Sequence, residues 1–181
     1  MVTAMVALMM TVVLVGCGGD DGAGGYAIDG QVRDVLTGGD CTADTESDPG
    51  REHVPDPSHS VNPPAGGEHF GDRIAFPGTY SPDETPPDGE IVHSLEHGFV
   101  VLWHQPGLPE AQLSQLRQIH EDDPGGILVV PREGLEVPVA VTSWHRRLLC
   151  PEGFEEEPVT AFLENFRGDA PESGDPPFFP D

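Results

Sequence analysis

Four histidines stand in sequence settings where imidazole nitrogens could bind a metal ion: His53, His69, His93 and His97. The last two are four residues apart, a spacing that puts both rings on one side of a helical turn. Such a pair can hold one metal ion. The loop before it is rich in Gly and Pro and can bring the other two histidines to the same turn. We therefore predict a histidine metal site, and imidazoles without a thiolate favour Cu(II) or Zn(II).

A structural role is the alternative interpretation of these histidines. An irregular loop has many backbone groups to satisfy, and imidazoles can hydrogen-bond its carbonyl groups without any metal. The protein would then be a metal-free interaction module of the cell envelope. The sequence leaves both interpretations open.

The segment His93-Ser94-Leu95-Glu96-His97 also matches H-x-x-E-H, the signature of inverted zinc peptidases, in which the glutamate is the general base. Such sites need a long helix, whereas Gly98 and a β-rich run follow here at once. The sequence therefore assigns no catalytic residue, and Glu96 is the base only if the protein is a metal-dependent hydrolase. A binding protein is the favoured interpretation.

The elements that must position these residues are predicted mainly after residue 90. Three apolar, β-rich runs predict strands, at residues 99–103, 127–130 and 137–144. Apolar residues on one face predict helices at 109–121 and 158–166. Recurring prolines predict a long loop over residues 48–89. The expected fold is α+β, a small single domain with a three- to four-stranded mixed sheet, two helices and a long Pro/Gly-rich loop.

The N-terminal segment predicts export. Residues 4–15 are uncharged and apolar, and this run is too short for a membrane span of about 20 residues, so it is typical of a signal-peptide core. It ends in Leu14-Val15-Gly16-Cys17, which resembles the lipobox of bacterial lipoproteins, where the cysteine is acylated. Two or more acyl chains anchor a protein stably. We expect a cell-envelope protein held by lipid on Cys17 at the extracytoplasmic side of a bacterial membrane.

The chain is predicted to divide into four segments. These are a signal peptide at 1–16, a flexible tether at 17–39, a folded domain at 40–172 and a disordered acidic, Pro-rich tail at 173–181. The formal net charge is −24 at pH 7. Nucleic-acid binding requires Lys and Arg to neutralise phosphate, so this charge excludes nucleic acid as a partner. The membrane is the partner that the sequence indicates.

Once Cys17 carries lipid, Cys41 and Cys150 are the remaining cysteines. An even pair in an oxidising compartment predicts a disulfide. A redox-active pair is the competing interpretation, but the C-x-x-C spacing that lowers a thiol pKa is missing.

The order of several motifs resembles a known family. The motifs are His53-Val54, Asn62-Pro63-Pro64 with His69 behind it, the block His93 to Gly98, Cys150, and Ala170-Pro171-Glu172. Together they are similar to a bacterial and archaeal family called domain of unknown function 3105, over about residues 41–172. The usual family motif N-P-P-T-S-G-P-H is altered here at Ala65, Gly66 and Glu68. The resemblance implies a shared site formed by His53, His69, His93, Glu96 and His97. It also implies a disulfide bridge between Cys41 and Cys150, and it implies no established activity.

Overall fold

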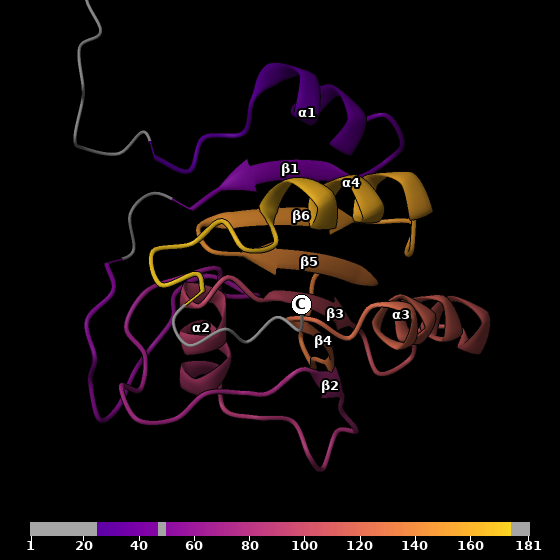
Figure 1. The fold of residues 1–181 in the computed structure, drawn as a ribbon. Coiled ribbons are helices and arrows are strands. Elements are labelled where there is room, and N and C mark those ends of the chain that lie inside the picture. The colour runs from indigo at the N-terminus through magenta and orange to yellow at the C-terminus, as the bar shows by residue number, and fades with distance from the viewer. Residues whose placement is uncertain (1–24, 47–49, 175–181) are drawn as a thin grey trace, which may run out of the picture.

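The computed structural model describes residues 25–46 and 50–174 (Figure 1). Cys17, the predicted signal peptide and most of the predicted tail lie outside these residues. The helices are α1 (Gly30–Leu36), α2 (Asp88–Glu96), α3 (Glu110–Asp122) and α4 (Glu156–Phe166). The strands are β1 (Thr42–Thr45), β2 (Gly78–Thr79), β3 (Val100–His104), β4 (Ile127–Pro131), β5 (Val139–Ser143) and β6 (Arg146–Cys150).

The strands form one mixed sheet in the order β1-β6-β5-β3-β4-β2. Strand β4 pairs parallel with both β2 and β3. The pairs β3–β5, β5–β6 and β6–β1 are antiparallel. The prediction of a small α+β domain with a mixed sheet is confirmed. The predicted number of elements is wrong, because the described residues contain six strands and four helices instead of three to four strands and two helices.

The strands that the sequence analysis missed are short or polar. Strand β1 has the sequence TADT, and β2 has two residues. Strand β6 begins with two arginines, and Arg147 makes an ion pair of 2.7 Å with Asp44 on β1. Their strand structure comes from backbone pairing with neighbours, since apolar alternation is weak in all three.

The helices that were missed lie in segments expected to be irregular. Helix α1 falls in the segment predicted to be a flexible tether; Asp29 caps it by accepting from the Gln31 N–H at 2.9 Å, and Leu36 is fully buried. Helix α2 begins directly after Pro87, at the end of the proline-rich stretch. A proline just before the first turn is compatible with a helix because the first N–H groups have no intrahelical partner.

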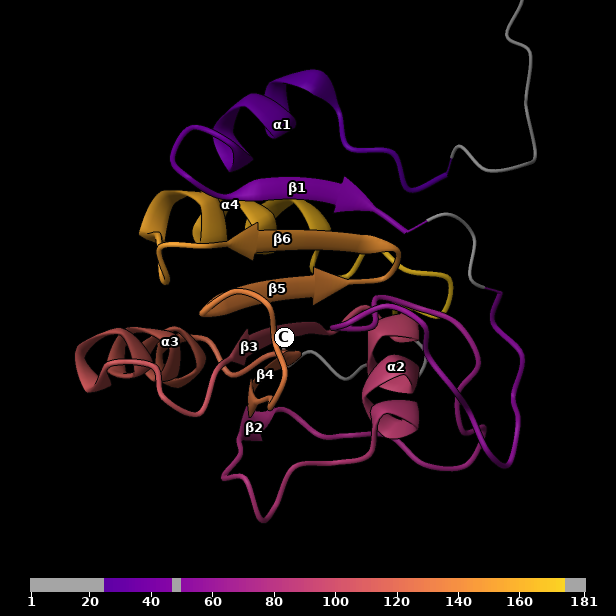
Figure 2. The same cartoon turned by 180° about the vertical axis from the view of Figure 1, so that it is seen from behind.

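The sheet has a hydrophobic core on each face. One core packs the sheet against α1, α3 and α4, through residues such as Leu36, Leu116 and Phe162. The other packs it against α2, through Ile91 and Leu95. Helix α4 lies in front of the sheet in Figure 1, and α2 lies in front in the reverse view of Figure 2. The histidines of α2 are therefore on the face opposite the other three helices.

The proline-rich loop packs against α2 and holds it in place. Backbone hydrogen bonds join Ala75 to Glu90 at 3.2 Å and Phe70 to Gly89 at 3.3 Å. Gly89 has no room for a side chain, because an added Cβ would lie 2.5 Å from Pro57. The long irregular segment is thus an ordered part of the domain in the described residues. No helix in the described part of the chain has the length and apolar character needed to cross a membrane.

Candidate metal centre

Two separate stretches of the loop are paired next to α2. The Val54 N–H donates to the His69 carbonyl at 2.9 Å, and the His69 N–H donates to the Glu52 carbonyl at 3.1 Å. This parallel bridge sets the ring centroids of His53 and His69 4.7 Å apart. The backbone pairing therefore brings together two histidines that are distant in sequence.

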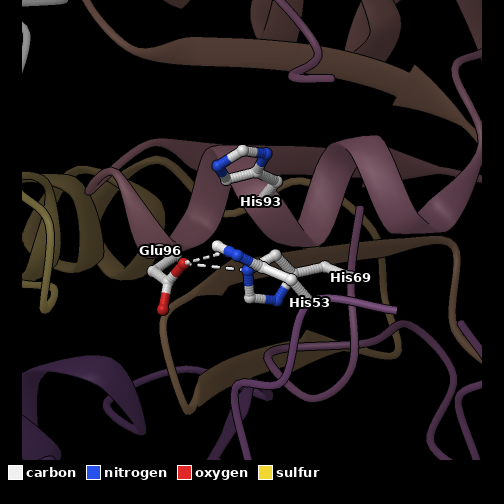
Figure 3. A group of neighbouring side chains, drawn as sticks. All are labelled: His53, His69, His93 and Glu96. Carbon is white, nitrogen blue, oxygen red and sulfur yellow. Dashed lines mark hydrogen bonds and ion pairs between the residues drawn. The ribbon is translucent and has the colours of Figure 1, made fainter. Parts of the chain in front are cut away.

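The two loop histidines meet side chains from the last turns of α2. One potential ligand atom from each of His53, His69, His93 and Glu96 lies within 4.8 Å of all the others. The Glu96 Oε2 atom is 2.8 Å from His69 Nε2 and 3.7 Å from His53 Nε2, and Figure 3 shows this carboxylate pointing towards both rings. Three imidazoles and one carboxylate make a four-ligand set that suits Zn(II), and Cu(II) also binds such ligands.

Backbone carbonyl groups fix the tautomers of two rings. His69 Nδ1 lies 2.9 Å from the Gly67 oxygen, and His93 Nδ1 lies 2.7 Å from the Arg73 oxygen. A carbonyl oxygen can only accept, so both Nδ1 atoms carry hydrogen and donate. The Nε2 atom of each ring is then the one available to a metal. A histidine ligand held by a carbonyl at its other nitrogen is the usual arrangement in metal sites.

The buried centre of this group is an ion pair in the metal-free protein. The side chains of His69 and Glu96 are 0% and 2% exposed. Burial opposes charge on His69, but its hydrogen bonds to Glu96 and Gly67 outweigh burial and raise the pKa of the ring. Burial likewise opposes charge on Glu96, and the hydrogen bond from His69 outweighs it and lowers the pKa of the carboxyl group. Both shifts favour the charged form of the pair when no metal is bound.

The other groups around the pair differ in exposure. Burial, together with the nearby histidines, lowers the pKa of His93, although its bond to the Arg73 carbonyl acts in the opposite direction. A neutral ring is the form that binds a metal. His53 is half exposed, so this side of the group is open to solvent. Arg51 lies at the edge, with Nη1 4.0 Å from Glu96 Oε1.

His97 lies next to this group and belongs to a second one. Its Nε2 atom is 3.2 Å from His93 Nε2 and 3.7 Å from Glu172 Oε2. The group His93, His97 and Glu172 also has one ligand atom of each residue within 4.8 Å of the others. Of the four predicted histidines, the structure thus gathers three with Glu96 and places His97 in a second group that shares His93.

Sequence reasoning did not single out Glu172 as a site residue. Glu172 stands at the boundary of the predicted tail, far from His97 in sequence, and no spacing rule connects the two. The available signal was the segment Ala170-Pro171-Glu172, which is part of the family resemblance.

The peptidase interpretation gains no support from the geometry. Helix α2 has nine residues and ends at Glu96, whereas inverted zinc peptidases carry the motif within a long helix. Glu96 Oε2 is directed at His69 and belongs to the group of potential ligands. It is placed to bind a metal or a histidine, which differs from the role of a general base acting on water.

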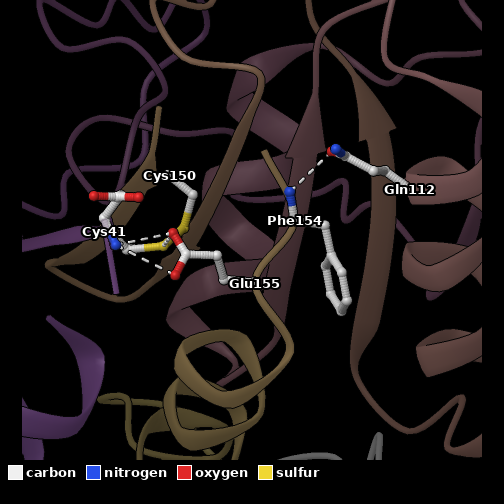
Figure 4. The surroundings of a disulfide bond; sticks show 6 residues. Cys41, Gln112, Cys150, Phe154 and Glu155 are labelled. Atoms are coloured by element: carbon white, nitrogen blue, oxygen red, sulfur yellow. Dashed lines mark hydrogen bonds between the residues drawn. A yellow bond between two sulfur atoms is a disulfide. The ribbon is translucent and has the colours of Figure 1, made fainter. Parts of the chain in front are cut away.

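Cys41 and Cys150 are joined by a disulfide on the other face of the sheet (Figure 4). Both are buried, and Glu155 lies beside them, where its carboxylate accepts from the Asp40 N–H at 3.2 Å. The two cysteines and Glu155 are close enough to form a metal-ligand group. Metals bind the thiolate form, so the disulfide removes these sulfurs as metal ligands. The disulfide therefore has a structural role in the fold, away from the histidines.

Comparison with known proteins links the chain to one family. A family model described as "Protein of unknown function (DUF3105)" matches residues 56–177. This range includes His69, His93, Glu96, His97 and Glu172, and begins just after His53. Comparison with curated proteins and with solved structures found no match.

Proposed function

The chain belongs to the DUF3105 family, and we propose that it binds one transition-metal ion, Cu(II) or Zn(II), through His53, His69, His93 and Glu96. The observation that carries this proposal is the meeting of four potential ligand atoms within 4.8 Å, from two loop stretches and one helix. The two carbonyl groups that orient His69 and His93 support it further. Their Nε2 atoms need no change of tautomer to bind a metal.

We further propose that the protein acts outside the cytoplasm and is held to the membrane by lipid on Cys17. The lipobox-like segment before Cys17 supports this placement, and a disulfide in the folded domain agrees with an oxidising compartment. A nitrogen-rich ligand set without thiolate is suited to metals under such conditions. Where copper and zinc are both present, the Irving–Williams order favours Cu(II) at this site.

Metal analysis of the purified protein tests the metal proposal. We expect about one equivalent of Cu or Zn per chain in the wild-type protein and its loss in His69→Ala and in His93→Ala/His97→Ala. His120→Ala is the matched control, because His120 is a half-buried histidine on α3 that donates to the Ile127 carbonyl, away from the site. A wild-type protein that takes up neither Cu(II) nor Zn(II) would overturn the proposal.

Fractionation of cells tests the anchor. Wild-type protein is expected in the membrane fraction and labelled by a fatty-acid probe. Cys17→Ser should remove the label and leave the protein unprocessed, because the hydroxyl group of serine does not replace the thiolate nucleophile. Equal labelling of wild type and Cys17→Ser would show that lipid is not attached at this residue.

A metal-free interaction module is the second candidate function. The observation that favours it is the His69–Glu96 hydrogen bond of 2.8 Å, which satisfies both buried groups without an ion. In that case a chelator would leave the melting temperature unchanged, while His69→Ala would still lower it. Metal binding predicts that the chelator lowers the melting temperature of the natively purified protein and that added metal restores it.

A further inference from the structure

His93 is common to two groups of potential ligands. The first is the proposed metal site. The second consists of His93, His97 and Glu172, again with ligand atoms within 4.8 Å of one another. The two groups thus share one residue, His93.

The shared ring allows one ion in the two groups at a time. His93 Nδ1 donates to the Arg73 carbonyl at 2.7 Å, so Nε2 is its metal-binding atom. A neutral imidazole nitrogen has one lone pair and binds one ion. His93 Nε2 and His97 Nε2 lie 3.2 Å apart, close enough for both atoms to bind one ion in the second group. Filling one position therefore empties the other.

The two positions differ in ligand number and in access. The first offers three imidazoles and a carboxylate, and Glu96 and His69 are almost fully buried. The second offers two imidazoles and Glu172, whose side chain is 42% exposed. A site with fewer ligands and more water holds an ion less tightly. We call the first the inner position and the second the outer position.

The outer carboxylate is held in place by the backbone. The Glu172 N–H donates to the Glu96 carbonyl at 3.0 Å, and the Gly168 N–H donates to the Gly98 carbonyl at 2.8 Å. The chain after α4 therefore crosses the C-terminal end of α2 on two hydrogen bonds. Gly98 permits this crossing, because it has φ +87° and an added Cβ would lie 2.9 Å from Gly168 Cα.

We propose that one metal ion exchanges between the two positions through His93, entering and leaving by way of His97 and Glu172. This inference rests on the proposed metal-binding function and adds a route to it. Glu172 captures the ion at the surface, His97 and His93 hold it with Glu172, and the ion then moves to the inner ligands while His93 stays bound. No bond other than metal–ligand bonds changes in this step.

Rapid-mixing kinetics with Cu(II) test the route in the full-length protein. Glu172→Gln should slow both Cu(II) uptake and its loss to a chelator by about tenfold, the lower end of the effect of local charge on the capture rate of an ion. The equilibrium affinity should remain essentially unchanged, because the inner position sets it. His97→Gln should act in the same way, and both variants should bind one Cu(II) per chain.

Glu164→Gln is the control, because Glu164 is an exposed glutamate on α4 away from both positions. The route is refuted if Glu172→Gln and Glu164→Gln give the same rates, if affinity falls by the same factor as the rates change, or if wild type binds two Cu(II) ions. Wild-type protein that binds one Cu(II) with unchanged rates in Glu172→Gln overturns the route alone. Wild-type protein that binds neither Cu(II) nor Zn(II) overturns the proposed function as well.

Discussion

Replacing Glu96 by glutamine in the metal-free protein should destabilise it by an amount that depends on pH. Glu96 and His69 form a buried ion pair with Oε2 and Nε2 2.8 Å apart. Glutamine keeps the size of the side chain and an oxygen that accepts from His69, and it removes the negative charge. The charged imidazole then lies in a buried site without its counter-ion.

The magnitude follows from this loss of charge. Removing one partner of a buried ion pair costs about 3–5 kcal/mol, and we expect about 3 kcal/mol because the hydrogen bond to His69 survives. Once His69 is neutral, its remaining hydrogen is on Nδ1 and Nε2 no longer donates to Glu96, so the change affects at most one neutral hydrogen bond, which is worth about 1 kcal/mol. The cost of Glu96→Gln should therefore be about 3 kcal/mol where the pair is charged and about 1 kcal/mol or less where it is not.

The pKa shifts give the sign of the pH dependence. The pKa of His69 is raised in the folded protein, so its stabilising contribution is complete below the ordinary histidine value of about 6.5 and is lost as pH rises through the raised pKa. The pKa of Glu96 is lowered, so its contribution is complete above the ordinary glutamate value of about 4.3 and is lost at lower pH. The pair stabilises the fold most between these two pH values.

Urea unfolding of chelator-treated protein at pH 5.5 and at pH 8.5 measures the effect. We expect Glu96→Gln to lower the free energy of unfolding more at pH 5.5 than at pH 8.5, and Glu164→Gln to change it little at either pH, because Glu164 is exposed. An equal loss at both pH values, or a larger one at pH 8.5, would refute the ion pair as we describe it.

Three further predictions concern metal, the disulfide and Gly98. Metal at 100 times its Kd should add about 2.7 kcal/mol and raise the melting temperature by about 5–10 °C, measured by calorimetry with chelator-treated protein as the reference. Cys41→Ala/Cys150→Ala should lower the free energy of unfolding by about 4–5 kcal/mol, because the disulfide spans a sequence separation of 109 residues, and urea unfolding measures it. Gly98→Ala should cost about 1–2 kcal/mol from its positive φ alone. Gly107→Ala is its control, with no atom within 4 Å of the added Cβ, and equal stability of the two variants would contradict the close packing at Gly98.

The strands at the centre of the sheet were predictable because their residues are apolar without interruption. Strands β3, β4 and β5 are buried along their whole length, since helices or the loop cover both faces of the sheet. Strands β1 and β6 lie at one side of the sheet, where polar residues are tolerated. Their sequences therefore carry little strand signal, and long-range pairing decides their structure.

The histidine spacing predicted part of the site for a sound physical reason. His93 and His97 do lie one helical turn apart, as their i, i+4 spacing predicts, and their Nε2 atoms are 3.2 Å from each other. Helix α2 itself was missed because it follows a run of prolines and contains Gly89, His93 and Ser94, which are weak helix formers. Its helical state depends on burial against the sheet, which spacing does not reveal.

The convergence of His53 and His69 with α2 depends on contacts that no local pattern encodes. A backbone bridge pairs these two histidines. The Gly67 carbonyl accepts from His69 Nδ1 and the Arg73 carbonyl accepts from His93 Nδ1, which leaves Nε2 of each ring for a metal. Without metal, the His69 Nε2–H donates to the Glu96 carboxylate, at the place where the proposed ion would bind both groups. Protons and metal therefore compete for one place, so low pH favours the ion pair and higher pH favours the metal. The same contacts that keep the metal-free site folded also hold its ligands ready for the ion.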